Sequence, residues 1–409
     1  MQSFFPLLIT LLIQAFSALA LMAVPVLVPV VAAVEQAAPR LSAAGIGAFL
    51  LFAYLGAVLG SLSAGSFVER WGAIRTSQVA LGVSAAGLAL AAFTRDALPL
   101  AALLIGMGYG PITPASSHVL IRTTPAPRLN LVFSIKQTGV PLGVALSGFS
   151  IPLLAAGTGW TGTLLTLALA CVAVALAARP IQPALDAQTA TGHPGGVPAA
   201  FSVRRVLAQL AEPLTVIWRH RALRALAAVS FVLSGIQVSL SSYLVSYLTQ
   251  DLAVTAVLAG SVLGLSQMGG VMGRIVWGFL SDHLVAPLRM LGTLALVIAL
   301  SAGATGALAW WHVAPPTLVL AALMFVFGAT ASGWNGVYLA EVARQAPPGA
   351  AGKATSGTLA VTFLGVILGA PLFGLVAASS AGFAAAFGMQ AVLALGVAVL
   401  LFAFGARRR

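Results

Sequence analysis

The residue best suited to bind a charged ligand is Arg274, a lone arginine in the long apolar segment Gly264–His283. Asp282 closes this segment and marks a membrane edge, and Arg274 lies eight residues before it, about 12 Å of helix at ~1.5 Å per residue. The middle of a hydrocarbon core is ~15 Å from its edge, so Arg274 is expected close to the midplane. An arginine there costs at least ~2.5–3.5 kcal/mol. We expect it to bind an anion; the alternative is a guanidinium held by backbone carbonyls.

The acidic residues give the same indication by their positions. The chain has eight of them, and each falls in a loop or at the end of an apolar segment: Glu35, Glu69, Asp96, Asp186, Glu212, Asp251, Asp282 and Glu341. Proton-coupled carriers of cations need a buried carboxylate to hold the proton or the cation. The buried charge is positive here, so an anionic ligand would supply the missing negative charge.

A second cation, Lys136, lies in another apolar segment, next to Gln137 and the helix-breaking Gly139. Two interpretations stay open: Lys136 binds the same anion, or its side chain extends to the cytoplasmic surface. Amide, hydroxyl, imidazole and aromatic side chains in other apolar segments could complete a ligand site or simply join helices. These further candidates are Gln14, Gln237, Tyr109, His118, Trp334, Asn335 and Tyr338.

The elements that position these residues follow from composition. The chain has 409 residues, of which 60% are hydrophobic and 7% charged, with a mean hydropathy of +1.04. This balance indicates a polytopic membrane protein, whose spans must be helical because lipid offers the backbone no hydrogen-bond partners. Twelve segments are long enough to span: 4–34, 43–67, 74–93, 97–121, 131–156, 159–178, 223–248, 254–280, 288–311, 317–339, 354–378 and 382–406.

The basic residues predict the orientation. Seventeen of the 20 fall in or beside one set of loops, Arg40 and Arg95 fall on the other side, and Arg274 is the remaining one. The basic side of a membrane protein is cytoplasmic, so both termini are expected inside, in the inner membrane of a bacterium. The net charge of +12 is thereby explained by topology, and no nucleic-acid partner is expected.

The spans divide into two halves around the longest polar stretch. We expect a six-helix bundle over residues 1–178, a cytoplasmic linker over 179–221 and a second six-helix bundle over 222–409. The first part of the linker, rich in Pro, Gly, Ala and Thr, is predicted to be flexible. The second part, Ser202–His220, is predicted to be a basic interfacial helix with Ser202 as its N-cap.

The halves repeat a loop motif. Gly65, Glu69 and Arg70 follow the second span, and Gly278, Asp282 and His283 follow the eighth at one common offset. The first copy, with Gly72 and Arg75 further on, resembles the signature loop Gly-x-x-x-Asp-Arg-x-Gly-x-Arg of the major facilitator superfamily. Together with twelve spans in two pseudo-symmetric bundles, this resemblance covers the whole chain. It implies a transporter that works by alternating access.

The resemblance also implies roles for charged residues at the cytoplasmic side. In the superfamily, the loop carboxylate and arginines form a gate cluster that must part when the transporter changes state. This implies a gating role for Glu69, Arg70, Arg75 and Asp282. From their one-turn spacing at the end of the tenth span, Glu341 and Arg344 are predicted to form a further structural or gating pair.

The depth of Arg274 in the eighth span resembles the oxalate/formate and monocarboxylate branch of the superfamily, in which an arginine there holds the substrate carboxylate. We therefore expect a secondary transporter of small organic anions, with a proton or a counter-anion as its coupling partner, working as a monomer in lipid. The alternative is a proton-coupled exporter of drugs or metabolites. The sequence shows no metal cluster, cofactor motif or catalytic set, so no enzyme activity is expected.

Overall fold

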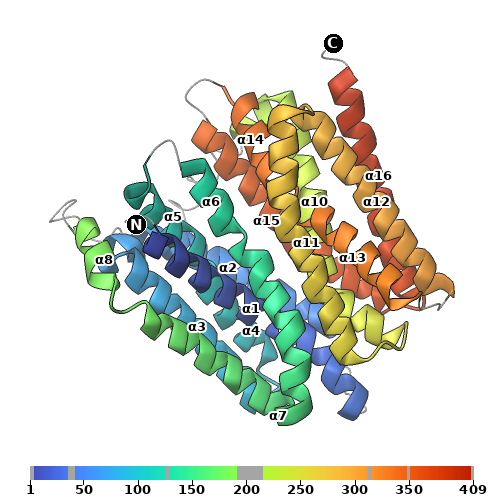
Figure 1. The fold of residues 1–409 in the computed structure, drawn as a ribbon, viewed down its shortest axis with the longest axis horizontal. Helices are drawn as coiled ribbons and strands as arrows, with labels where there is room; N and C mark the ends of the chain where they lie inside the picture. The colour runs from blue at the N-terminus through green and yellow to red at the C-terminus, as the bar shows by residue number, and fades with distance from the viewer. Residues whose placement is uncertain are drawn as a thin grey trace. The chain divides into compact units, whose positions relative to one another are not determined.

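The computed structural model describes residues 4–35, 42–125, 129–190, 215–311, 315–347 and 351–406. The elements in these ranges are α-helices (Figure 1), which confirms the all-α membrane fold class. Within these ranges, eleven helical segments are long and apolar enough to cross a membrane. Two compact units divide the chain: unit 1 comprises Met1–Leu27 with Ala48–Ser202, and unit 2 comprises Val28–Gly47 with Val203–Arg409.

The helices of the first six expected spans lie in the order of the sequence. They are α1 (Phe4–Glu35), α2 (Ala43–Trp71), α3 (Ala73–Phe93), α4 (Leu98–Tyr109), α5 (Ile112–Thr123), α6 (Leu129–Gln137) and α7 (Gly139–Ala177), followed by the short α8 (Gln182–Ala190). In unit 1, α3 packs against α4 and α7. The indole of Trp160 on α7 fixes one of these contacts by donating a hydrogen bond of 2.8 Å to the carbonyl of Ala91 on α3.

The helix α7 accounts for the difference between eleven candidate helices and the twelve spans expected. Its backbone is non-helical at Gly159, with φ 64° and ψ −164°, a combination that glycine adopts without steric cost. The ribbon of α7 reverses its direction, and the second half of α7 runs back along α3 (Figure 1). The uninterrupted candidate span Ile135–Ala177 is therefore long enough for two crossings, which fits the expected count.

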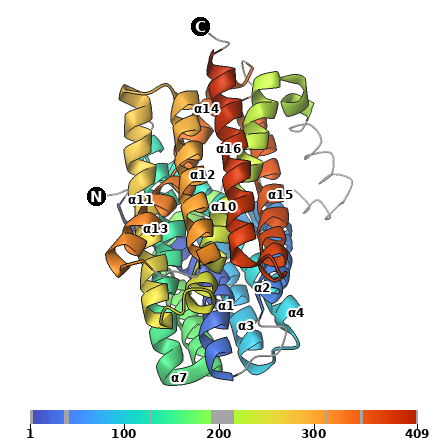
Figure 2. The same ribbon diagram turned by 90° about the vertical axis from the view of Figure 1, so that its right-hand side faces the viewer.

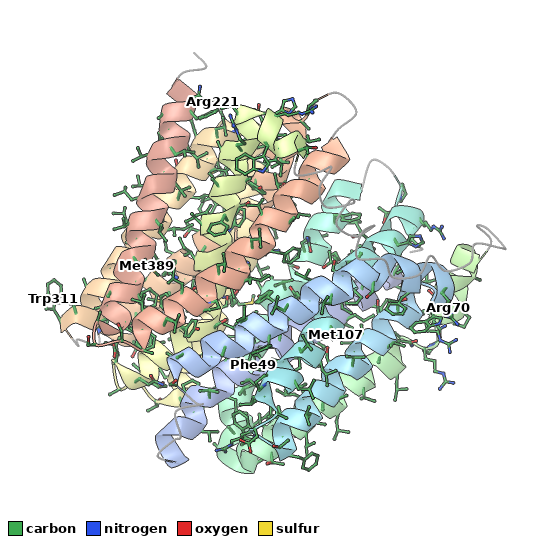
Figure 3. All side chains as sticks on the ribbon, turned by 180° about the vertical axis from the view of Figure 1, so that it is seen from behind. Phe49, Arg70, Met107, Arg221, Trp311 and Met389 are labelled. Carbon is green, nitrogen blue, oxygen red and sulfur yellow. The ribbon has the colours of Figure 1, made fainter. Side chains whose placement is uncertain are left out.

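The second unit contains the remaining helices. They are α10 (Arg221–Gln250), α11 (Ala256–His283), α12 (Pro287–Trp311), α13 (Thr317–Ala331), α14 (Asn335–Gln345), α15 (Ala351–Ala377) and α16 (Gly382–Ala406). The most extensive packing joins α12 to α16, α10 to α15 and α11 to α13 (Figures 1 and 2). Arg221 and Trp311 mark opposite ends of this unit (Figure 3), and Trp311 is 68% exposed, as an aromatic residue at a membrane interface would be.

Several spans are broken into two helices. The fourth span breaks between α4 and α5 at Gly110-Pro111, where proline cannot donate the backbone hydrogen bond that a continuous helix needs. The tenth span breaks between α13 and α14 at Ser332–Trp334. Sequence periodicity alone predicted both as continuous spans. Such breaks leave backbone groups that other side chains must satisfy.

Glycines bring α11 close to α13. A Cβ atom on Gly273 would lie 2.2 Å from the carbonyl oxygen of Ala329, and one on Gly328 would lie 1.9 Å from that of Ser266. Only glycine permits these approaches, so a neighbouring helix packs closely on the glycine face of α11. The close contact places the α11 side chains within reach of the broken span.

The linker differs from its prediction. Residues 182–190, expected to be part of a flexible stretch, form helix α8, which is held by a tertiary contact described below. Residues 215–219 of the predicted interfacial helix are helical. The predicted N-cap Ser202 and the rest of that helix lie outside the described residues.

Candidate functional site

Arg274 contacts the break in the tenth span. It lies on α11, its side chain is half-buried, and its Nε donates a hydrogen bond of 2.9 Å to the carbonyl oxygen of Ser332. Ser332 is the C-cap residue, directly after the last residue of α13. The guanidinium therefore sits at the negative end of a half-helix, where a positive charge is favourable, and one of its donors is held by a backbone carbonyl, as the alternative interpretation predicted.

Trp277 repeats this interaction three residues further along α11. Its indole Nε1 donates a hydrogen bond of 2.8 Å to the carbonyl oxygen of Ala329, three residues before Ser332. Two side chains on one face of α11 thus satisfy two carbonyls at the end of α13. We call Arg274 and Trp277 the α11 clamp. The hydrogen bond to Ser332 fixes the direction of the Arg274 side chain, whereas an arginine without such a bond would rotate freely.

Two predicted amides meet at the same break. Asn335, the first residue of α14, donates from Nδ2 to Oε1 of Gln237 on α10 at 3.2 Å. The same nitrogen lies 3.4 Å from the carbonyl oxygen of Ser332, which also accepts from Arg274. Arg274, Asn335 and Gln237 are therefore joined through one carbonyl into a polar cluster inside unit 2.

Two predicted aromatic residues flank this cluster. Trp334 is 0% exposed and Tyr338 is 1% exposed, and their rings pack edge to face with centroids 5.1 Å apart. Within the described part of the chain, the Trp334 indole N–H has no hydrogen-bond partner. A buried donor without a partner is costly, and the indole N–H is available to donate a hydrogen bond to an oxygen atom.

Unit 1 contains a similar hydrogen-bonded pair, formed by one amide and one hydroxyl group. The hydroxyl of Thr113, at the start of α5, donates to Oε1 of Gln14 on α1 at 3.2 Å. Gln14 lies on α1 and Gln237 on α10, and each bonds to one of the first two residues of the helix that follows a break. Gln14 is 0% exposed, and its Nε2 donor has no partner among the described residues. Each unit therefore contains a glutamine that is hydrogen-bonded to the start of a half-helix.

The remaining predicted binding residues lie in unit 1. Lys136 on α6 is 1% exposed, so its ammonium lies inside the protein and does not extend to the surface as one interpretation held. Gln137 follows it and is half-buried. Tyr109 ends α4 and His118 lies on α5, on either side of the break in the fourth span, and both are half-buried.

The predicted gating residues lie at helix ends. Arg70 is the second-last residue of α2 (Figure 3). Its side chain is exposed, as are those of Arg75 and Asp282. The side chain of Glu69 lies outside the described part. Glu341 and Arg344 form the expected pair, with Nε and Oε2 separated by 3.9 Å, and Gln345 donates to the other carboxylate oxygen of Glu341 at 2.6 Å.

Sequence reasoning missed two members of this arrangement, Trp277 and Ser332. Both act through contacts between α11 and α13, which are separated by more than 50 positions in the chain. The spacing of Arg274 and Trp277 on one helical face was a usable signal. The carbonyl of Ser332 carries no signal in the sequence.

Comparison with protein families decides the classification. The family model described as Major Facilitator Superfamily matches residues 10–357. The chain belongs to this superfamily. The match confirms the family that the loop motif and the repeated halves resembled.

Among characterised superfamily members, a gallate transporter of Pseudomonas putida is 28% identical over 264 residues, which are 59% of this chain and 58% of that protein. The chain therefore matches less than two thirds of this relative's length. Solved structures share the fold at low identity. A peptide transporter, POT, is 17% identical with a TM-score of 0.77 over 98% of this chain and 94% of its own. The xylose transporter XylE from E. coli is 16% identical with a TM-score of 0.68 over 98% of both chains.

Proposed function

We propose that this superfamily member is a secondary active transporter of small organic anions, chiefly carboxylates, and that Arg274 binds the anionic group. The observation that carries the proposal is the placement of this guanidinium inside a membrane span, held in direction by the carbonyl of Ser332. The two carboxylates that the described structure buries, Asp186 and Glu341, are bonded to other groups. An arriving carboxylate would place a negative charge beside this guanidinium.

The chemistry around Arg274 suits a carboxylate that also carries hydroxyl groups. A guanidinium offers parallel N–H donors that match the two oxygens of a carboxylate. The amides of Asn335 and Gln237 can exchange their mutual bond for bonds to a ligand hydroxyl. The edge-to-face pair Trp334 and Tyr338 supplies an apolar wall with a free indole donor.

The relative supports an aromatic version of this ligand. The matched Pseudomonas protein is named a gallate transporter, and gallate is a benzoate that carries three hydroxyl groups. Its combination of carboxylate, ring and hydroxyls corresponds to a guanidinium, an aromatic wall and neighbouring amides. We therefore propose hydroxybenzoates as the first substrates to test.

The remaining parts of the proposal concern the cycle and its setting. The chain would work by alternating access in the inner membrane of a bacterium, with its basic side and both termini in the cytoplasm. Either a proton or an exchanged anion would drive accumulation. Lys136 is buried in unit 1, in which Thr113 donates a hydrogen bond to Gln14, and we propose that Lys136 contributes a positive charge to anion binding.

Uptake into proteoliposomes tests the proposal. Labelled gallate should accumulate with the wild-type protein, and Arg274→Ala should abolish or strongly reduce uptake at low substrate concentration. Arg179→Ala, which removes an exposed arginine after α7, is the matched control and should transport normally. Uptake that is unchanged in Arg274→Ala would remove the arginine from the binding role. Export of a cationic drug that is insensitive to Arg274 would favour the exporter instead.

A further inference from the structure

The start of α3 is capped by a residue from a distant helix. Both carboxylate oxygens of Asp186 on α8 accept backbone hydrogen bonds there: Oδ1 from the N–H of Ile74 at 2.9 Å and Oδ2 from that of Arg75 at 3.1 Å. These are the second and third residues of α3, the positions that an N-cap side chain normally satisfies. Asp186 is 8% exposed, so the contact is shielded from solvent.

The local sequence cannot provide this cap itself. The residue in the N-cap position is Gly72, and the structure shows no side-chain cap from it. Gly72 has φ +88°, and a Cβ atom there would lie 2.2 Å from Cγ of Asp186. Glycine is thus required twice, once by its backbone conformation and once by the carboxylate that packs against it. Gly72, the glycine of the loop motif, thus leaves the space that the Asp186 carboxylate occupies.

The second unit handles the equivalent helix start differently. At the common repeat offset, Gly72 corresponds to Val285, and the helix that follows begins with Pro287. Proline at the first helical position has no N–H to satisfy. In the described part of unit 2, the equivalent helix therefore begins without a glycine before it. Gly72 is needed in unit 1 because the carboxylate of Asp186 packs against it.

We propose that Asp186 is a positioning residue for the signature loop: it holds the first turn of α3, and thereby Arg75, in the place from which the loop acts. The carboxylate fixes the backbone of Arg75 while the side chain of Arg75 remains exposed. The favourable interaction of a carboxylate with the positive end of a helix adds to the two hydrogen bonds. Helix α8, which follows the sixth expected span, thus holds the signature loop in place on the side expected to be cytoplasmic.

Hydrogen–deuterium exchange of the full-length protein in nanodiscs tests the local step. Asp186→Ala should speed exchange of the amides at 74 and 75 about 5- to 30-fold, in keeping with the loss of a helix cap, and leave the other spans unchanged. Asp186→Asn, which retains one acceptor oxygen, should protect one of the two amides. The matched control is the double substitution Asp186→Ala with Ala184→Asp, which returns a carboxylate to an exposed position of α8 and should not restore protection.

A transport measurement tests the functional step, and this arm alone rests on the proposed function. Asp186→Ala should lower the maximal rate of gallate uptake about 3- to 10-fold, the range that the loss of a helix cap allows, with KM within twofold, because none of the residues of the cap is a proposed binding residue. Unchanged exchange at 74 and 75, restored protection in the double variant, or faster exchange throughout the protein would each overturn the proposal. So would an unchanged maximal rate, or a rise in KM of similar size. Absence of gallate uptake by the wild type would count against the proposed function, and the exchange result would then decide the role of Asp186.

Discussion

The Nε of Arg274 and the carbonyl oxygen of Ser332 are 2.9 Å apart, and this bond joins the charged residue of α11 to the end of α13. The same side chain is therefore both a structural donor and the proposed anion-binding group. These two roles predict different consequences when the residue is changed, because only one of them requires a positive charge. Its neighbour in the α11 clamp, Trp277, has the structural role alone.

The clamp predicts a separation of stability from binding. Arg274→Ala and Trp277→Phe should each lower the free energy of unfolding by about 0.6–2 kcal/mol, since each removes a side-chain hydrogen bond to a backbone carbonyl at the end of α13. Only Arg274→Ala should also lose the rise in melting temperature that gallate gives to the wild type. Thermal unfolding in detergent, with and without gallate, measures both quantities. Equal ligand shifts in the two variants would contradict the binding role of Arg274.

The hydrogen-bonded pairs Gln237–Asn335 and Gln14–Thr113 each predict a coupling in unfolding free energy between their two members. Replacing both Gln237 and Asn335, as Gln237→Met and Asn335→Ala, should cost less than the sum of the single changes by about 0.5–1 kcal/mol, because the residues share a hydrogen bond. The pair Gln14→Met and Thr113→Val should behave alike. Double-mutant cycles on unfolding free energy provide the measurement. Combining Gln14→Met with Asn335→Ala is the control and should be additive, and coupling of equal size there would argue against the paired arrangement.

Much of this architecture could be predicted from the sequence. Span length, basic loops and the repeated loop motif led to the superfamily, which the family match confirms. The glycines at 269, 270, 273 and 278 give their segment a thin face that another helix can approach, and the structure shows such an approach at Gly273. These features depend on local composition and on periodicity, which a single sequence contains.

Other features depend on contacts between distant segments and could not be read from the sequence. The carbonyl of Ser332 and the indole of Trp277 meet partners across α11 and α13. Asp186 is 112 residues from Ile74, and its surroundings of Pro, Ala and Thr resemble a flexible linker. A short polar segment becomes ordered there because two backbone N–H groups at the start of α3 require an acceptor.

The contact between α11 and α13 predicts unequal effects of glycine substitutions on one helix. Gly273→Ala should destabilise the protein by about 1–3 kcal/mol, because the added Cβ would overlap the carbonyl of Ala329 and force the helices apart. Gly278→Ala, on the same helix, has no atom within 4 Å of its new Cβ and should be neutral or slightly stabilising. Melting temperatures of the purified variants compare the two. A larger loss for Gly278→Ala would be incompatible with this packing.

Burial of Lys136 predicts that charge removal affects binding more than folding. Lys136 is 1% exposed, and methionine is an unbranched apolar side chain that fills irregular core gaps, so Lys136→Met removes the charge while keeping the site filled. If the ammonium takes part in anion binding, KM for gallate should rise about 10-fold or more, as expected for the loss of a charged interaction of ~1.5–3 kcal/mol. Arg179→Met, which removes an exposed cation, should leave KM as it is. Initial uptake rates over a range of gallate concentrations give KM, and a value for Lys136→Met that equals the wild-type value would assign this lysine a purely structural place in unit 1.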